Sequence, residues 1–269
     1  MAITTITTFL RYPGSKRRML DFLAGHLPSA TSISGRFIEP FVGGGAIYFH
    51  LKPRTALLAD INVELIELYR GIQRSPQRIW QIYRSYPNTK QAYRQIRDHD
   101  PNAFTFLQRA ARSLYLNRTC FKGMWRHNLE GKFNIGYGGQ SRRWAIRRRD
   151  LIEISSRLRK ATVRCSDFEP IIAKAKPNDY LFLDPPYRPG QREQLHQHYS
   201  GKFSFEDHRR LASCLRQAHK RGIRWGLTIS NNQDILHLYK GYKLISIPEG
   251  TSTRIGVKTQ KSGEVFISN

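Results

Sequence analysis

The sequence has few acidic residues: 20 Asp and Glu stand against 45 Lys and Arg, which gives 269 residues a formal net charge of +25 and a pI near 10.5. The acids are dispersed along the chain, which argues against the clustered carboxylates of metal-dependent nucleases and phosphotransferases, so we expect no metal site. So large a positive surplus predicts a polyanionic partner, and nucleic acid is the polyanion that a soluble protein most commonly meets. A charged surface kept for solubility alone is the alternative.

Cysteines and long apolar runs are also scarce. The three cysteines, Cys120, Cys165 and Cys214, are far apart and form no Cys-x-x-Cys pair, which argues against a disulfide framework, a zinc site or a redox pair. We expect reduced thiols in a cytoplasmic protein. No apolar run approaches the roughly 20 residues that span a bilayer, and the start of the chain lacks the pattern of a signal peptide. We therefore expect a soluble protein with no membrane partner.

The chain does contain enough apolar material for a core, because 39% of its residues are hydrophobic and 12% are aromatic, which excludes a disordered basic tail. Strand-like apolar runs alternate with segments of helical spacing, and this alternation is typical of an α/β sheet covered on both faces. The predicted strands are 37–39, 56–59, 162–165, 180–183, 224–229, 243–247 and 264–267. The predicted helices are 16–27, 63–72, 103–116, 150–159 and 205–221.

One gap in this alternation is too long for a single crossover. About a hundred residues between positions 59 and 162 contain no convincing strand, which predicts a helical insertion at 73–160 in a core domain made of 1–72 and 161–269. Within it, residues 105–160 hold fourteen Lys or Arg against three acids. Aromatic residues alternate with these charges, as a surface that neutralises phosphate and stacks on bases requires, namely Tyr115, Phe121, Trp125, Phe133, Tyr137 and Trp144. Some of them belong to a core in the alternative interpretation, which we favour for Tyr115.

Residues 37–47 read FIEPFVGGGAI, an apolar strand followed by a glycine-rich turn and a helix. The turn is neither Gly-x-Gly-x-x-Gly nor a phosphate-binding loop with Gly-Lys-Ser/Thr, which favours another nucleoside-bearing ligand. Asp60 ends the next strand, about twenty positions on, where Rossmann-like sheets hydrogen-bond a ribose hydroxyl. The alternative is that Asp60 or Asn62 caps the helix that follows.

Residues 181–187 read LFLDPPY and end another apolar strand. The two prolines remove two backbone donors, which leaves carbonyls and the Asp184 carboxylate as an acceptor-only pocket beside the flat ring of Tyr187. An exocyclic amino group fits such a pocket. Its two N–H groups can donate to Asp184 and to the Pro185 carbonyl, which frees the nitrogen lone pair for attack on an electrophile.

Residues 9–18 read FLRYPGSKRR, a turn followed by a basic helix start. Positive charge at the start of a helix opposes the helix dipole, so an anionic ligand group near Lys16 would account for it. A solvated basic turn is the alternative.

These three motifs, in this order and with a basic insertion between them, resemble the Dam-type (class alpha, D12) DNA adenine N6-methyltransferases over almost the whole chain. Residues 114–118 (LYLNR), Gly123, 128–129 and 131–134 resemble that family's target-recognition region, and 229–231 (ISN) also fit. The resemblance implies a seven-stranded, Rossmann-like methyltransferase sheet with a reversed final strand and S-adenosyl-L-methionine as methyl donor. It further implies base flipping in double-stranded DNA, direct in-line transfer to the N6 amino group of adenine, a monomer, and a cognate restriction endonuclease as a candidate partner.

The resemblance also assigns roles to residues. Tyr12 and Lys16 would touch the donor, the glycine turn would bend around its amino-acid portion, Asp60 would hold its ribose, and Asp167 with Phe168 would lie at its adenine. The full donor-binding set is Tyr12, Lys16, Phe41, Gly43, Gly44, Gly45, Asp60, Asp167, Phe168 and Asp184. The flipped base would be received by Asp184, Pro185, Pro186 and Tyr187.

In the insertion, the expected DNA contacts are Arg118, Lys122, Arg126, Asn128, Glu130, Lys132, Arg142, Arg143, Arg147, Arg148 and Arg149. Arg126, Asn128 and Glu130 flank Gly131 and suit guanine, adenine and cytosine edges respectively. Glu130 stands where the best-known GATC-specific relative has Arg, and an acid cannot make the bidentate contact to guanine that Arg makes. The recognition sequence therefore stays open. Two other functions also stay open: methylation of an amino group in RNA, and DNA binding by a catalytically inactive relative, which the intact Asp184 and Tyr187 argue against.

Overall fold

The computed structural model describes residues 9–12, 14–128, 130–139, 146–186, 203–248 and 263–269. These residues form a seven-stranded sheet with the order β3-β2-β1-β4-β5-β7-β6. The strands are β1 (Phe37–Glu39), β2 (Ala56–Asp60), β3 (Ala161–Cys165), β4 (Tyr180–Leu183), β5 (Arg224–Ser230), β6 (Lys243–Ser246) and β7 (Glu264–Ser268). Strands β1 to β5 are parallel, whereas β7 runs antiparallel to both β5 and β6. All seven predicted strands form, each within one residue of the expected bounds, and the reversed final strand is confirmed.

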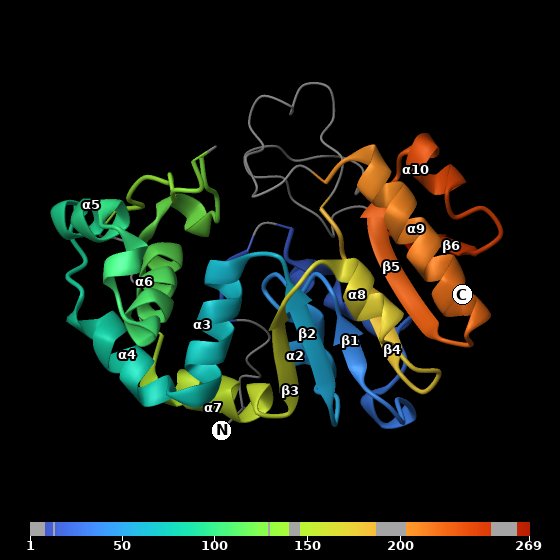
Figure 1. The fold of residues 1–269 in the computed structure, drawn as a ribbon, viewed down its shortest axis with the longest axis horizontal. Coiled ribbons are helices and arrows are strands. Elements are labelled where there is room, and N and C mark those ends of the chain that lie inside the picture. Colours follow the sequence, from blue (N-terminus) through green and yellow to red (C-terminus); the bar gives the residue numbers. More distant parts are fainter. Residues whose placement is uncertain (1–8, 13, 129, 140–145, 187–202, 249–262) are drawn as a thin grey trace.

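The central strands are buried on both faces, and alternate side chains enter two separate cores. Phe37 and Phe182 pack on one face, together with α1 (Leu20–Ala24), α2 (Ala46–Leu51), α3 (Val63–Arg74) and α7 (Arg148–Leu158). Ile38 and Leu181 pack on the other face, together with α8 (Phe168–Ala173), α9 (Phe205–Lys220) and α10 (Gln233–His237). Figure 1 shows α9 covering β5 and α8 lying beside β4. The predicted α/β sheet with helices on both faces is therefore confirmed.

The helical insertion packs beside α3, away from the sheet (Figure 1). It contains α4 (Pro76–Ser85), α5 (Lys90–Asp98) and α6 (Phe106–Thr119), and α6 contacts both α3 and α4. Helices α3 and α6 approach closely at Gly71 of α3, where an added Cβ would lie 2.7 Å from the Cβ of Ala110 in α6. The insertion thereby shares one buried apolar cluster with the sheet.

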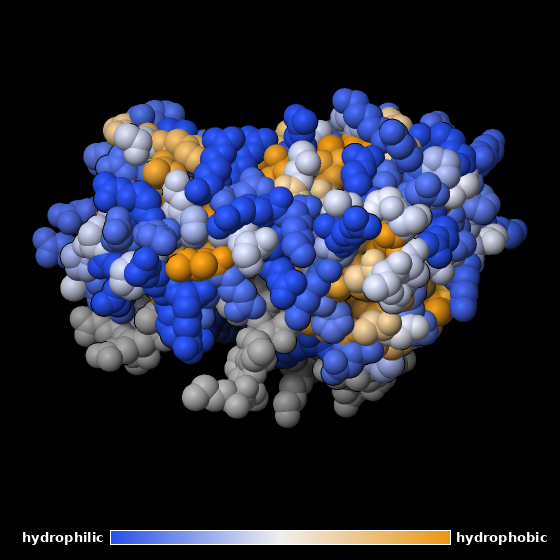
Figure 2. Space-filling model, turned by 90° about the horizontal axis from the view of Figure 1, so that it is seen from below, coloured by the Kyte–Doolittle hydropathy of each residue, from blue (hydrophilic) through white to orange (hydrophobic). Residues whose placement is uncertain are grey.

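Two predicted helices differ from the observed bounds by more than two residues. The helix expected at 103–116 begins at Phe106, because Thr105 and Gln108 form a capping box there, and it runs on to Thr119. The single helix expected at 16–27 is a 3-10 turn, η1 (Lys16–Met19), followed by the short α1. None of the helices in the described ranges is both long and apolar enough to cross a membrane. Seen from below, the surface is mostly hydrophilic, with hydrophobic side chains in small separate groups (Figure 2).

Candidate active site

Three carboxylates gather at the carboxyl edge of the sheet. Glu39 ends β1, Asp60 ends β2 and Asp184 directly follows β4. Because β1 lies between β2 and β4 and the three strands are parallel, their carboxyl ends lie next to one another. The chain order of the strands reverses between β1 and β4, and open α/β sheets bind their ligands at such a point.

The glycine-rich turn lies over this edge. Gly43 (φ +45°) and Gly45 (φ +66°) adopt backbone conformations that favour glycine, and Gly45 is the N-cap of α2. A Cβ at Gly43 would lie 3.1 Å from the ring of Tyr12, so this ring lies directly against the turn. The Tyr69 hydroxyl donates to the Gly43 carbonyl (2.9 Å) and fixes the turn from α3. Tyr12 and the turn thus form one wall of the site.

Asp60 connects the turn to β2. Its Oδ2 accepts from the backbone N–H of Gly43 (3.1 Å) and its Oδ1 from that of Asn62 (3.0 Å). Burial raises the pKa of the Asp60 carboxyl, and these backbone hydrogen bonds oppose the rise. The cap of α3 is Asn62, whose side chain accepts from the N–H of Leu65 (3.0 Å). Of the two capping candidates, only Asn62 takes that role.

Glu39 is a site residue that the motif analysis did not single out. Its side chain is 3% exposed, and its Oε2 has no hydrogen-bond partner among the described residues. Burial raises the pKa of the Glu39 carboxyl well above its ordinary value, and the negative charge of Asp184 raises it further. A buried, unsatisfied carboxylate is costly in a folded protein and is typical of a functional site. The available sequence signal was an acid at the end of an apolar strand.

Asp184 accepts from two side chains at the same oxygen. Its Oδ1 lies 2.9 Å from the ammonium nitrogen of Lys16 and accepts from the Thr228 hydroxyl at 2.8 Å. Lys16 is 4% exposed and also lies 3.5 Å from Oε2 of Glu264. Lys16 was expected beside an anionic group of the ligand. Asp184 and Glu264 are carboxylate partners of this ammonium, and its expected contact with the donor stays a prediction.

The residues expected at the donor's adenine are Asp167 and Phe168. They follow β3, and Phe168 lies next to Phe41 at the start of the glycine-rich turn. Phe41 packs against Phe168, with ring centroids 5.4 Å apart, and both rings also contact Phe203. Asp167 caps α8 by accepting from the N–H of Glu169 (2.9 Å), and it also accepts from Arg210 (3.1 Å). Asp167 stays half-exposed at the end of β3, whereas Phe168 is buried in the second core.

A family model described as D12 class N6 adenine-specific DNA methyltransferase matches residues 12–253, which include every residue of this site except Glu264. The chain belongs to this family. It is therefore an adenine-specific DNA methyltransferase, and the family supports that interpretation over the RNA-modifying and catalytically inactive alternatives.

Three relatives illustrate the similarity. The chain is 30% identical to the Type II methyltransferase M1.LlaDCHI of Lactococcus lactis subsp. cremoris, over 97% of this chain and 94% of that protein. It is 34% identical to the DNA N-6-adenine-methyltransferase of Escherichia phage P1, over 86% of this chain and 31% of that protein. It is 29% identical to the DNA adenine methylase of Vibrio cholerae serotype O1, over 96% of this chain and 94% of that protein.

Solved structures add little to this assignment. The rRNA methyltransferase aviRa from Streptomyces viridochromogenes is 14% identical and covers 100% of this chain and 93% of its own, with a TM-score of 0.39. This similarity is too low to bear on the substrate.

The predicted base-reading residues of the methyltransferase lie on a small hairpin, whose described residues are 126–128 and 130–134. His127 and Phe133 pair in an antiparallel bridge, and the Asn134 N–H donates to the Arg126 carbonyl (3.1 Å). Glu130 is exposed at the tip, where it pairs with Lys132. The Asn128 Oδ1 accepts from the N–H groups of Glu130 (3.1 Å) and Lys132 (2.9 Å). Asn128 therefore closes the turn from within, a role that was not foreseen.

The hairpin is anchored to the core of the methyltransferase. His127 is buried, and its Nε2 lies 2.9 Å from Oε2 of Glu64 in the first turn of α3. The Arg126 Nε donates to Oδ1 of Asn134 (2.9 Å), which braces the two arms of the hairpin. The tip is thereby held at a fixed position relative to the glycine-rich turn, since Glu64 lies four residues after Asp60, which accepts from the Gly43 N–H.

Residues 114–118 resemble the family's target-recognition region, but 114–117 are buried and Arg118 is half-buried. Asn117 accepts from the Arg11 N–H (3.2 Å) and donates to the Arg11 carbonyl (2.6 Å). The Arg118 guanidinium donates to the Phe9 carbonyl, and burial lowers its pKa to about 10. Arg118 therefore holds the N-terminal segment in place, and we correct its assignment as a DNA contact.

The aromatic residues of the insertion divide into two groups. Tyr115, Trp125 and Phe133 are buried in the core, which confirms the interpretation favoured for Tyr115. Phe121 is 46% exposed, and the ammonium of Lys122 lies 5.3 Å from the centre of its ring. The other expected contacts of the insertion that are exposed are Glu130, Lys132, Arg147, Arg148 and Arg149. The expected residues Trp144, Arg142, Arg143 and Tyr187 lie outside the described ranges.

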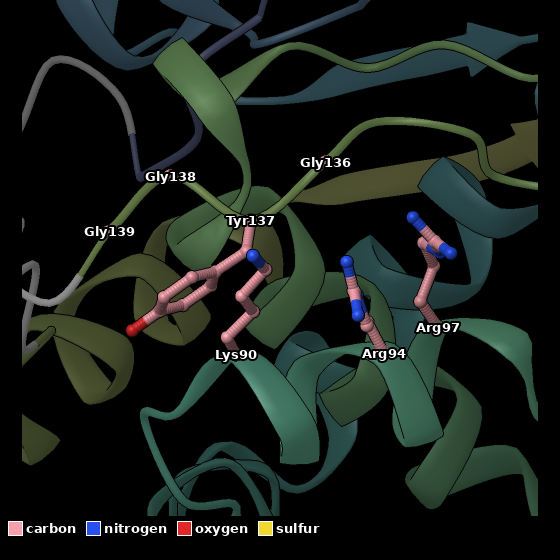
Figure 3. A pocket seen from close by; sticks show the side chains of 7 residues that line it. All are labelled: Lys90, Arg94, Arg97, Gly136, Tyr137, Gly138 and Gly139. Atoms are coloured by element: carbon pink, nitrogen blue, oxygen red, sulfur yellow. The ribbon is translucent and has the colours of Figure 1, made fainter.

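A basic hollow of about 480 Å³ lies between α5 and residues 136–139. Figure 3 shows Lys90, Arg94 and Arg97 along α5, facing the loop that carries Tyr137. The Arg97 guanidinium is paired with Asp98 (2.7 Å). The DNA contacts expected from the sequence lie within 105–160 and include none of these three cations, although Lys90, Arg94 and Arg97 stand at helical spacing in the sequence.

Proposed function

We propose that the enzyme transfers a methyl group from S-adenosyl-L-methionine to an adenine flipped out of double-stranded DNA, with Asp184 accepting a hydrogen bond from the reacting amine. The observation that carries this assignment is the position of Asp184. It lies at the carboxyl edge of the sheet, next to the glycine turn, and two side-chain donors hold its carboxylate.

The residues at the glycine turn fit this donor. Its sulfonium and ammonium groups are cationic, and the orphaned Oε2 of Glu39 supplies a buried acceptor for such a group. Asp60 adds a second carboxylate beside the turn, where a ribose hydroxyl can donate to it. When bound, S-adenosyl-L-methionine supplies an electrophilic methyl group.

The protein contributes alignment and hydrogen-bond acceptors. Asp184 and the buried Pro185 carbonyl accept the two N–H groups of the adenine amine, which directs the nitrogen lone pair toward the donor. Tyr187 supplies a stacking face for the base, and Pro186 keeps the turn rigid. No covalent nucleophile is required for this transfer.

We propose that the exposed tip of the hairpin reads base edges, whereas the exposed cations contact phosphates. The phosphate set includes Lys122, Arg147, Arg148 and Arg149, and the hollow on α5 extends it to Lys90 and Arg94. The enzyme acts as a cytoplasmic monomer in this proposal. A cognate restriction endonuclease is the candidate partner, since the Lactococcus lactis relative is named a Type II methyltransferase.

The deciding experiment incubates the protein and its Asp184→Ala variant with a labelled methyl donor and with duplex DNA or structured RNA, then maps the modified bases. We expect N6-methyladenine at a short DNA sequence, and less than a tenth of that turnover in Asp184→Ala with DNA binding largely retained. Label in RNA alone, or full activity of Asp184→Ala, would contradict the proposal.

A further inference from the structure

Thr228 is a polar residue in the buried middle of β5, between Leu227 and Ile229. Its side chain is fully buried, with 0% exposure, and its hydroxyl donates to Oδ1 of Asp184 at 2.8 Å. The Leu183 carbonyl is a more distant second acceptor at 3.4 Å. Because a hydroxyl carries one proton, the shorter contact decides its direction. A buried hydroxyl is costly without such a partner, so this contact fixes where the side chain points.

The strand register brings Thr228 to this position. Leu183 of β4 lies opposite Leu227 of β5, so the residues that follow them, Asp184 and Thr228, are level on adjacent parallel strands. Glu264 begins β7 and lies opposite Ser230, at the same end of the sheet. From there it approaches Lys16, which contacts the same Oδ1 of Asp184.

We propose that Thr228 is a positioning residue for methyl transfer, which orients the Asp184 carboxylate while the Lys16 ammonium, which lies between Asp184 and Glu264, compensates its charge. The terminal torsion of an aspartate side chain has broad preferences, so the rotamer alone does not set the plane of the carboxylate. Two donors on one oxygen do set it. Acceptance of an amine N–H depends on that plane, and misplacing a group that aligns the reacting atoms slows transfer. This inference rests on the proposed role of Asp184.

The test compares Thr228→Val, which removes the hydroxyl at nearly constant shape, with Thr228→Ser, which retains it. In single-turnover assays we expect Thr228→Val to transfer methyl about 10- to 100-fold more slowly, as loss of a hydrogen bond to a charged group predicts. Its affinities for donor and DNA should stay unchanged, and Thr228→Ser should recover most of the rate. If Thr228 had only a structural role, Thr228→Val would lower the stability of the protein together with its affinities for donor and DNA, and Thr228→Ser would not selectively restore the rate.

Thr162→Val is the matched control, because Thr162 is exposed on β3 of the same sheet. A second measurement needs no turnover: the carboxyl-carbon NMR resonance of Asp184 in the donor-free protein. It should shift in Thr228→Val and stay in place in Thr162→Val. An unchanged resonance, or a folded Thr228→Val enzyme with the wild-type rate, overturns the assignment of Thr228. Failure of the wild-type protein to methylate DNA adenine would instead refute the proposed function and leave the resonance test of Thr228 in force.

Discussion

Replacing Glu39 by Gln should stabilise the donor-free enzyme and weaken donor binding. The Glu39 carboxyl is buried, and its Oε2 has no hydrogen-bond partner among the described residues. Burial raises the pKa of this carboxyl well above its ordinary value, and the charge of Asp184 raises it further. Gln keeps the shape of the side chain and removes its charge. The same substitution therefore relieves a cost of folding and deletes an acceptor for a cationic group.

The sign of the stability effect follows from the direction of the pKa shift. A carboxyl whose pKa is higher in the folded state binds more protons there than in the unfolded chain, so the contribution of Glu39 to the stability of the wild-type protein falls as the pH rises above about 4.3, the ordinary pKa of Glu. The advantage of Glu39→Gln should therefore be present at neutral pH and disappear below about pH 4. For the donor, a lost hydrogen bond to a charged group costs about 1.5–3 kcal/mol, or about 10- to 150-fold in affinity.

Thermal unfolding between pH 4 and 8 and calorimetric titration of the donor measure both effects. If Glu39 binds a cationic group as a carboxylate, the titration should also show proton release in the wild-type protein and none in Glu39→Gln. The control is Glu206→Gln, because the Glu206 side chain is 71% exposed. A Glu39→Gln protein that is less stable than the wild type at neutral pH, or that binds the donor equally well, would refute this reasoning.

Three further predictions concern the ribose, the phosphates and the base edges. Asp60→Ala should weaken donor binding by about 1–3 kcal/mol in calorimetry, and an unchanged affinity in a folded variant would leave Asp60 only as the brace of the glycine turn. Lys90→Ala should weaken binding equally on all DNA sequences and reduce the slope of log K against log salt by about one. An unchanged slope would show that the hollow on α5 does not contact DNA phosphates. Arg126→Ala and Glu130→Ala should alter the methylation profile on a randomised DNA library at a cost of roughly 1–3 kcal/mol on the preferred site, and unchanged profiles would place specificity elsewhere.

The central strands could be predicted from the sequence because they are short apolar runs that are buried on both faces. The helices of the insertion were harder to predict individually. α4 and α5 were not predicted individually, and α5 buries only Tyr93 among its nine residues. α6 was displaced by three residues at its start because the capping box at Thr105, not the apolar spacing, sets where it begins.

The site residues that could be predicted from the sequence are those at the ends of apolar strands. Asp60 and Asp184 end apolar runs, and parallel strands bring such residues together. The contacts of Thr228 and Glu264 depend on register between strands distant in sequence, which no local pattern shows. Arg118 was misassigned for the same reason, since its partner Phe9 lies more than a hundred residues away. A basic residue in a basic segment gives no sign of whether it faces DNA or the interior.

The proposed function requires that a strongly basic protein select a base over a phosphate, and the distribution of charge favours this selection. Four of only 20 acidic residues, Glu39, Asp60, Asp184 and Glu264, meet at one edge of the sheet, and Lys16 alone among the described cations is paired within this group. The basic exterior attracts the DNA backbone, whereas the acidic edge repels phosphate and attracts a cationic donor. A neutral base is the part of DNA that can enter without electrostatic cost. In the proposed function, base flipping therefore matches the electrostatics of the site as well as its shape.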